Sequence, residues 1–210
     1  MGIPVLILGE SGSGKSASMR NFEPEEVSIF NVAAKPLPFR KKLPAKSTAD
    51  YNAIMQGLNA SSKKAFVIDD SQYLMCFENF AKAKETGYQK FTDMALHFYN
   101  LVQFIIRNLP PDVIVYFLHH TETDANTGKV KAKTMGKMLD SQLTVEGMFS
   151  IVLLCTTDGK KHSFITQSDG YTTAKSPMEM FPPEIDNDLK AVDQTIREYY
   201  ELNKKGTDET

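Results

Sequence analysis

Eight residues near the start of the chain combine glycines, a lysine and a serine at a spacing suited to holding phosphate. Glycines permit backbone conformations closed to other residues, so consecutive N–H groups can turn inward around an anion. Lys15 would then reach the outer phosphates of a nucleotide, and the hydroxyl of Ser16 would hold Mg²⁺. The segment matches the phosphate-binding pattern G-x-x-x-x-G-K-[ST]. The predicted loop consists of Gly9, Glu10, Ser11, Gly12, Ser13, Gly14, Lys15 and Ser16. Ala17, which follows it, is also expected to contact the nucleotide.

Two consecutive acids supply a second group suited to the same chemistry. Asp69 and Asp70 follow the apolar run Ala65–Ile68. A buried strand of a parallel sheet delivers such a carboxylate at its C-terminal end, in the crevice where these sheets bind ligands. Asp69 is therefore expected to hold Mg²⁺ together with Ser16, and a purely structural role is the alternative.

A third polar group follows another apolar run. Val113–Leu118 is expected to form a buried strand, and His119, His120, Thr121 and Glu122 come directly after it. If the sheet is parallel, these side chains lie beside the bound phosphates. The alternative is a pair of histidines that make ordinary hydrogen bonds near the surface.

Apolar runs and helical periodicities indicate the elements that must position these groups. A helix is expected to begin near Gly14 and to end between residues 21 and 24, with its positive end directed at the anion. Ser47 or Thr48 would cap a helix over 48–58, and a turn with Asp158 and Gly159 predicts a hairpin of strands 149–156 and 161–166. Strands are also expected at 3–8, 27–32 and 65–70, and helices at 88–109 and from about 185 to 200.

Composition restricts the class of protein. The 210 residues are 41% hydrophobic and 24% charged, with a formal net charge of -2, which is ordinary for a soluble domain and excludes a uniformly basic nucleic-acid binder. We expect one domain over 1–203 with a flexible tail at 204–210. Cys76 and Cys155 are expected to be buried thiols in a reducing compartment. With neither an export signal nor a membrane span expected, a cytoplasmic location follows.

Two segments carry most of the local positive charge. Lys35–Lys46 has three prolines and five cations around Phe39, and Thr123–Lys137 is a polar, glycine-containing stretch with four lysines. Both are expected to be irregular. They are either solvated loops or contacts to nucleic acid or to a neighbouring subunit, because cations can follow phosphates while an aromatic ring stacks on a base.

The motifs together resemble a known family. Besides the phosphate loop, the relevant segments are Val67–Asp70, Phe117–His120, Thr173–Pro177 and Ile185–Leu189. The chain is similar to the small RecA-like ATPases, related to AAA-type enzymes, that phages encode near recombination and replication genes. Some of these act as single-strand annealing proteins. The resemblance implies a three-layer α/β fold of the P-loop NTPase type, with a mostly parallel sheet, a strand between those of the loop and the acids, and a C-terminal antiparallel hairpin.

One departure from this family concerns the catalytic base. RecA-like enzymes place a glutamate after the second strand, but the segment Ile29–Lys35 contains no acid. Asp70 is then the first candidate to activate water, Glu122 the second, and His119 a further catalytic candidate beside Lys15. If none of them does so, hydrolysis is slow.

The expected function is binding and hydrolysis of ATP with Mg²⁺ by a homo-oligomer on single-stranded DNA, in phage recombination or replication. A single-strand-binding protein is a candidate partner, no membrane is involved, and a phage-encoded protein would work in the host cytoplasm. Lys133 or Lys137 would reach a neighbouring subunit's phosphates in place of an arginine finger. Three alternatives remain: a small-molecule kinase, disfavoured by only four arginines; a GTPase, disfavoured by the missing Asn-Lys-x-Asp; and an assembly protein that binds ATP with little hydrolysis.

Overall fold

A sheet of nine strands organises the computed structural model, which describes residues 1–202. Its strand order is β3-β2-β4-β5-β1-β7-β8-β9, and β6 pairs with β5 beside this path. The strands are β1 (Ile3–Gly9), β2 (Val27–Asn31), β3 (Ala45–Ser47), β4 (Ala65–Asp69), β5 (Ile114–Thr123), β6 (Val130–Ala132), β7 (Ile151–Thr157), β8 (His162–Ile165) and β9 (Glu184–Asp186).

Most neighbouring strands run parallel. The path from β3 to β7 is parallel throughout, whereas β8 pairs antiparallel with β7 and with β9, and β6 pairs antiparallel with β5. The expected mostly parallel α/β sheet and its hairpin at the C-terminal side are confirmed. So is the expected strand order around the site, because β5 lies between β1 and β4.

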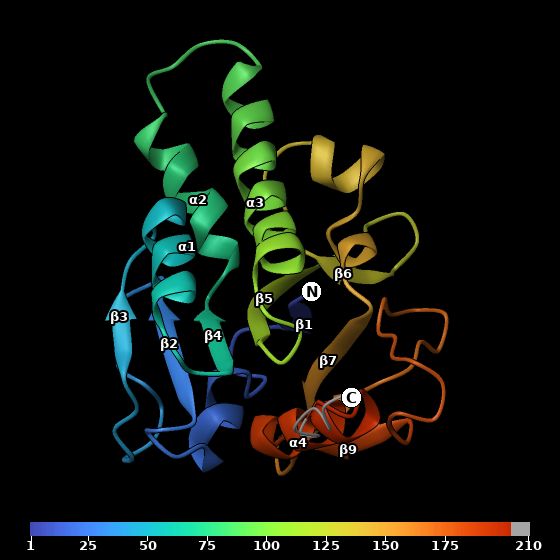
Figure 1. Cartoon of the computed structure of the whole chain (residues 1–210). Helices are drawn as coiled ribbons and strands as arrows, with labels where there is room; N and C mark the ends of the chain where they lie inside the picture. Colours follow the sequence, from blue (N-terminus) through green and yellow to red (C-terminus); the bar gives the residue numbers. More distant parts are fainter. Residues whose placement is uncertain (203–210) are drawn as a thin grey trace, which may run out of the picture.

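Helices cover both faces of the sheet and make three layers (Figure 1). The helical segments are η1 (Ser16–Asn21), α1 (Tyr51–Ala60), α2 (Gln72–Ala81), α3 (Gln89–Asn108), η2 (Met138–Gln142), η3 (Val145–Met148) and α4 (Leu189–Tyr199). Strand β1 contributes to the cores on both faces, since Leu6 and Leu8 pack with α1, α2 and α3, while Val5 and Ile7 pack with η1 and α4.

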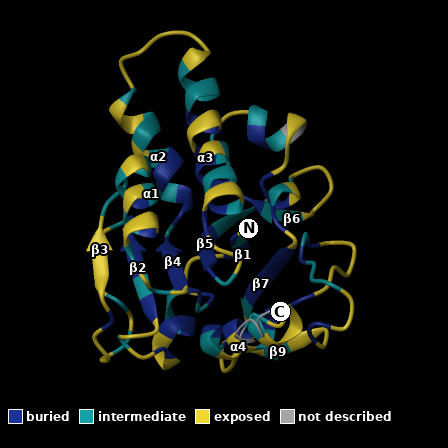
Figure 2. Ribbon diagram, viewed as in Figure 1, coloured by how far each residue is buried: buried dark blue, intermediate teal, exposed yellow. Residues whose placement is uncertain are grey.

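The central strands are the most buried part of the molecule, as Figure 2 shows for β1, β4, β5 and β7. Parallel strands that are covered on both faces consist of nearly continuous apolar runs, which is why the sequence located them well. Exposure concentrates at β3, on the outer sides of the helices and in the connection between α2 and α3 (Figure 2). Within residues 1–202, no helix is both long and apolar enough to cross a membrane.

The first helix differs from the expectation. The chain forms the six-residue 3₁₀ helix η1, which begins at Ser16 rather than near Gly14 and ends at Asn21, within the expected range of 21 to 24. Ser18 competes with the backbone here, because its hydroxyl donates to the carbonyl of Lys15 over 2.6 Å. Phe22 is already extended. The strong helix dipole that was expected to face the anion is therefore absent from this short segment.

Other boundaries also differ. Helix α1 begins at Tyr51, and its cap is Asp50, whose carboxylate accepts from the N–H of Ala53 over 2.9 Å. Ser47 and Thr48 are therefore not the caps. Strands β3, β6 and β9 and helix α2 were not expected, and β5 continues beyond Leu118 to Thr123. The expected tail at 204–210 lies outside the described residues.

Candidate functional site

The glycine-rich loop, residues 9–16, connects β1 to η1 and has two positions that only glycine fits well. Gly12 and Gly14 have φ values of +83° and +102°, a region that L side chains disfavour. At Gly9 the restriction is steric, since a Cβ atom there would lie 2.4 Å from the hydroxyl oxygen of Ser13. The loop is thus a compact turn whose shape explains all three of its glycines.

Side chains from the C-terminal part of the chain hold the carbonyls of this loop. The carbonyl of Ser13 accepts from the thiol of Cys155 over 3.0 Å and from Nδ1 of His162 over 2.7 Å, and that of Gly14 accepts from the amide of Asn187 over 3.3 Å. Because a trans peptide directs its C=O and N–H in opposite directions, the N–H of Gly14 is directed away from Cys155 and His162. The bonds from Cys155 and His162 thus fix the orientation of the peptide between Ser13 and Gly14.

The ammonium group of Lys15 closes the same loop. Its Nζ donates to the carbonyls of Gly9 and Glu10, each over 2.8 Å, and the residue is 6% exposed. Burial lowers the pKa of Lys15, while nearby Cys155 and the carboxylates of the site act in the opposite direction. The charge is therefore held inside the loop, close to where an anion would sit.

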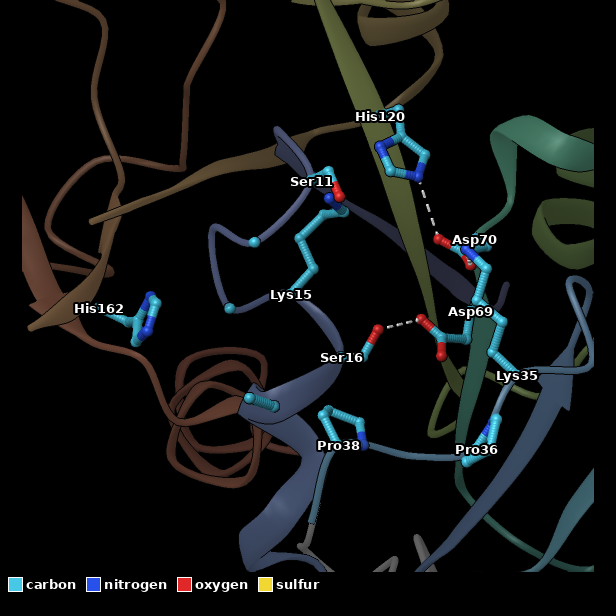
Figure 3. Close-up of a pocket in the computed structure, with 13 residues that line it drawn as sticks. Ser11, Lys15, Ser16, Lys35, Pro36, Pro38, Asp69, Asp70, His120 and His162 are labelled. Carbon is cyan, nitrogen blue, oxygen red and sulfur yellow. Dashed lines mark hydrogen bonds and ion pairs between the residues drawn. The ribbon is translucent and has the colours of Figure 1, made fainter. Parts of the chain in front are cut away.

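Ser16 and Asp69 meet although they are far apart in the sequence. The hydroxyl of Ser16 donates to Oδ1 of Asp69 over 2.8 Å (Figure 3). Burial raises the pKa of Asp69, and the bond from Ser16 partly offsets this. The strand order brings them together. Strand β5 lies between β4, which ends at Asp69, and β1, which leads into the loop that contains Ser16.

Asp70 is held in a different way from Asp69. Its backbone is left-handed, with φ of +58°, and both of its oxygens are engaged: Oδ1 accepts from Nε2 of His120 over 3.1 Å and Oδ2 from Nζ of Lys35 over 2.9 Å. Burial raises the pKa of Asp70, but the bonds from His120 and Lys35 outweigh it and hold the pKa below its usual value. Asp70 is thus a fixed anion with two cationic or donor partners.

These groups surround a cavity of about 340 Å³. His162 lies on one side of the loop, and the two aspartates and His120 lie on the other (Figure 3). The lining residues are Ser11, Gly12, Gly14, Lys15, Ser16, Ala17, Lys35, Pro36, Pro38, Asp69, Asp70, His120 and His162.

Three loop residues of the predicted site contribute without lining this cavity. Gly9 and Ser13 are buried within the turn, and Glu10 contributes its backbone carbonyl to Lys15 while its side chain is exposed. The hydroxyl of Ser13 is buried and finds no hydrogen-bond partner among residues 1–202. A buried polar atom without a partner is uncommon in folded proteins.

His119 does not join the cavity. Its imidazole is fully buried, accepts from the hydroxyl of Ser71 at Nδ1 and donates from Nε2 to the carbonyl of Lys133, with both distances at 2.9 Å. Burial lowers the pKa of His119 to about 4. This neutral ring joins the middle of β5 to the start of α2 and to the segment after β6, which is a structural role.

Glu122 also lies apart from the cavity. It belongs to the β5–β6 ladder, where it faces Lys131, and the two side chains form an ion pair of 3.5 Å. Neither Glu122 nor His119 was therefore brought to the predicted position beside the phosphates.

Sequence reasoning missed four cavity residues and chose the wrong histidine of a pair. Lys35, Pro36 and Pro38 belong to the segment that was expected to be a solvated loop or a nucleic-acid or subunit contact, and His162 lies in the predicted hairpin; no local pattern indicated that either segment lines the cavity. For His120 a signal existed: consecutive residues of a strand point to opposite faces, and His120 is level with Gly9 in the parallel register.

Some side chains of the two lysine-rich segments already have partners within the chain. Lys41 pairs with Glu23 over 3.0 Å, and Lys131 contacts Asp140 as well as Glu122. Phe39 is partly buried against the core on the η1–α4 side, so it is not a free ring for stacking on a base.

The known proteins give no further guide to this site: comparison with models of protein families and with curated proteins found no match. The chemistry must therefore be argued from the residues themselves. The arrangement offers one buried ammonium, a hydroxyl and carboxylate in contact, and a second lysine on the far side of the cavity. Such a set suits a polyphosphate with a divalent cation.

Proposed function

We propose that the protein binds ATP with Mg²⁺ on the glycine-rich loop and hydrolyses it slowly. The contact between Ser16 and Asp69 carries this proposal, because a hydroxyl on the loop and a carboxylate on β4 are the two protein ligands that a phosphate-bound Mg²⁺ needs. Support also comes from Lys15, from the glycine conformations of the loop and from the position of β5 between β1 and β4.

The side chains fit the metal as well as the nucleotide. Within residues 1–202, no three His, Cys, Asp or Glu side chains gather to hold a metal ion by themselves. Mg²⁺ in nucleotide sites commonly takes one or two protein ligands and completes its shell with phosphates and water. When bound, the ion neutralises phosphate charge, and Ser16 and Asp69 fix its place relative to the loop.

The state of the carboxylates supports slow turnover. Among the cavity-lining residues, the carboxylates are those of Asp69 and Asp70. The first is placed for the metal, and both oxygens of the second are already bonded to His120 and Lys35. A carboxylate with a lowered pKa and two partners is a weak proton acceptor. This observation also favours the second candidate function, an assembly protein that binds ATP with little hydrolysis.

The action on single-stranded DNA, as a homo-oligomer, is a further part of the proposal. Exposed cations support it: Arg40, Lys42, Lys46 and Lys133 form no ion pair with any residue in 1–202. The backbone N–H of Lys133 donates to the carbonyl of His120 over 2.9 Å. This segment therefore adjoins a residue that lines the phosphate cavity, which provides a physical route between nucleotide and DNA.

Calorimetric titration with ATP and Mg²⁺, followed by measurement of phosphate release with and without single-stranded DNA, tests the proposal. Saturable binding with slow release is expected. Absence of binding overturns it, and binding without any release favours the assembly protein.

A further inference from the structure

Lys35 occupies a place in the cavity that its sequence did not suggest. It follows β2, lines the cavity opposite the loop that contains Lys15, and donates from Nζ to Asp70 over 2.9 Å (Figure 3). The same Nζ lies 4.8 Å from the centre of the Tyr73 ring. Lys35 and Lys15 are the two lysines among the cavity-lining residues, so the cavity has a cation on each side.

The backbone around Lys35 is held by a buried side chain. Asn31 is 7% exposed, and its side-chain amide bonds to both backbone polar groups of Lys35. Its Nδ2 donates to the Lys35 carbonyl over 2.6 Å, and its Oδ1 accepts from the Lys35 N–H over 3.3 Å. Ala34, between them, takes a left-handed conformation with φ of +54°. A left-handed non-glycine residue costs free energy and persists where the surroundings require it.

The Asn31 side chain that holds Lys35 lies next to the strand that ends at Asp69. Asn31 is the register partner of Asp69 in the β2–β4 ladder. The position of Lys35 relative to Asp69 and Asp70 is therefore set by the sheet and by the Asn31 amide, rather than by a freely moving loop.

The side chain itself can still exchange partners. It is 59% exposed, whereas that of Asp70 is 13% exposed, so moving the ammonium group requires little loss of burial. Asp70 would keep its bond from His120 after such a move. A phosphate in the cavity offers more negative charge than one carboxylate, and a lysine binds it as a point charge.

We propose that Lys35 contacts the terminal phosphate of the bound triphosphate, and that Asp70 serves as the holder of this lysine rather than as the base. The inference rests on the proposed function. Lys35 is an alternative to Lys133 or Lys137 of a neighbouring subunit as the source of this charge, because it lines the cavity within the same chain.

The first test compares affinities for two nucleotides. Lys35→Ala should weaken binding of the non-hydrolysable analogue β,γ-imido-ATP by about ten- to hundredfold, the effect of losing one charge-assisted hydrogen bond. The affinity for ADP should stay unchanged, and Lys35→Arg should restore most of the loss. Lys84→Ala, at an exposed position outside the cavity, is the matched control.

The second test follows the amine directly. Acylation of lysines, read by mass spectrometry in the intact protein, should show Lys35 protected by β,γ-imido-ATP and left reactive with ADP. Equal affinity ratios in wild type and Lys35→Ala, or no difference in protection, overturn the inference while ATP binding stands. Loss of all nucleotide binding by the wild type would overturn the proposed function as well, so the two failures are distinguishable.

Discussion

The hydroxyl of Ser16 and the carboxylate of Asp69 are 2.8 Å apart, although 53 residues separate them in the chain. The contact links the loop after β1 to the end of β4, across the intervening strand β5. This hydrogen bond places two oxygen atoms on one side of the cavity, and we propose that the same two atoms bind Mg²⁺ when nucleotide is present.

Removing either ligand should abolish the effect of Mg²⁺. Ser16→Ala and Asp69→Asn each leave one oxygen donor fewer, so nucleotide affinity should become nearly independent of Mg²⁺, while metal-free binding persists through Lys15. Titrations with ATP in the presence of Mg²⁺ or of a chelator measure this. Ser62→Ala, at an exposed position outside the cavity, is the control. Wild-type dependence on Mg²⁺ in both variants would contradict the metal assignment.

The two glycines with positive φ should differ in their tolerance of a methyl group. A Cβ at Gly12 meets nothing within 4 Å, whereas a Cβ at Gly14 would lie 2.8 Å from Nδ1 of His162. Gly12→Ala should thus cost only backbone strain of about 1–2 kcal/mol, and Gly14→Ala should cost more because His162 must leave Ser13.

Urea denaturation of the single variants and of Gly14→Ala combined with His162→Ala measures this difference. In the double variant the clash is gone, so the two effects should be less than additive. Equal destabilisation by both alanines would argue against the contact between His162 and the loop.

Acid should destabilise the fold through His119. Its pKa is about 4 in the fold and 6.5 as the ordinary value, so the unfolded chain binds the proton first as the pH falls. Stability is then full above about pH 6.5 and declines toward pH 4, by about 2 kcal/mol at pH 5. Urea denaturation at pH 7.5 and 5.0 measures this, and the decline should be smaller in His119→Gln. An identical decline in that variant would show that other groups are responsible.

The fold could be predicted from the sequence where apolar runs fall on central strands, as they do for Ile3–Leu8 and the segment before Asp69. Helix α2 was not predicted because its apolar residues lie on more than one side of the helix, which hides the helical periodicity. Phe77 and Phe80, for example, are 39% and 70% exposed. Strand β6 has only three residues and pairs with the far end of β5, so local composition could not reveal it.

The candidate site, like the fold, could be predicted from the sequence only in part. Contiguous motifs predicted that the loop and Asp69 share a site, and the structure places both beside one cavity. The partners of Asp70 could not be found in this manner, because Lys35 and His120 lie 35 and 50 residues from it, and their meeting depends on the strand order and on a single register.

Single-stranded DNA should bind through the cations that lack a partner acid in residues 1–202. Replacing Lys42, Lys46 and Lys133 together by Ala should weaken binding and reduce the salt slope by about 2, at roughly 0.7 per phosphate contact. Lys131→Ala should change little, because Lys131 already pairs with Asp140. Anisotropy of labelled DNA with ATP over a range of salt measures both. No binding at low salt, or an unchanged slope in the triple variant, would refute the proposal that these lysines contact DNA.

Binding of ATP with Mg²⁺ by the wild type and by Lys15→Ala, followed by isothermal calorimetry, tests the central claim most directly. Lys15 places its ammonium group between the carbonyls of Gly9 and Glu10, inside the loop, so its removal takes away the cation closest to the proposed phosphates. Circular dichroism shows whether the variant is folded. The account predicts one ATP bound per wild-type chain and no measurable binding by the folded Lys15→Ala variant; equal affinities in the two proteins would contradict it.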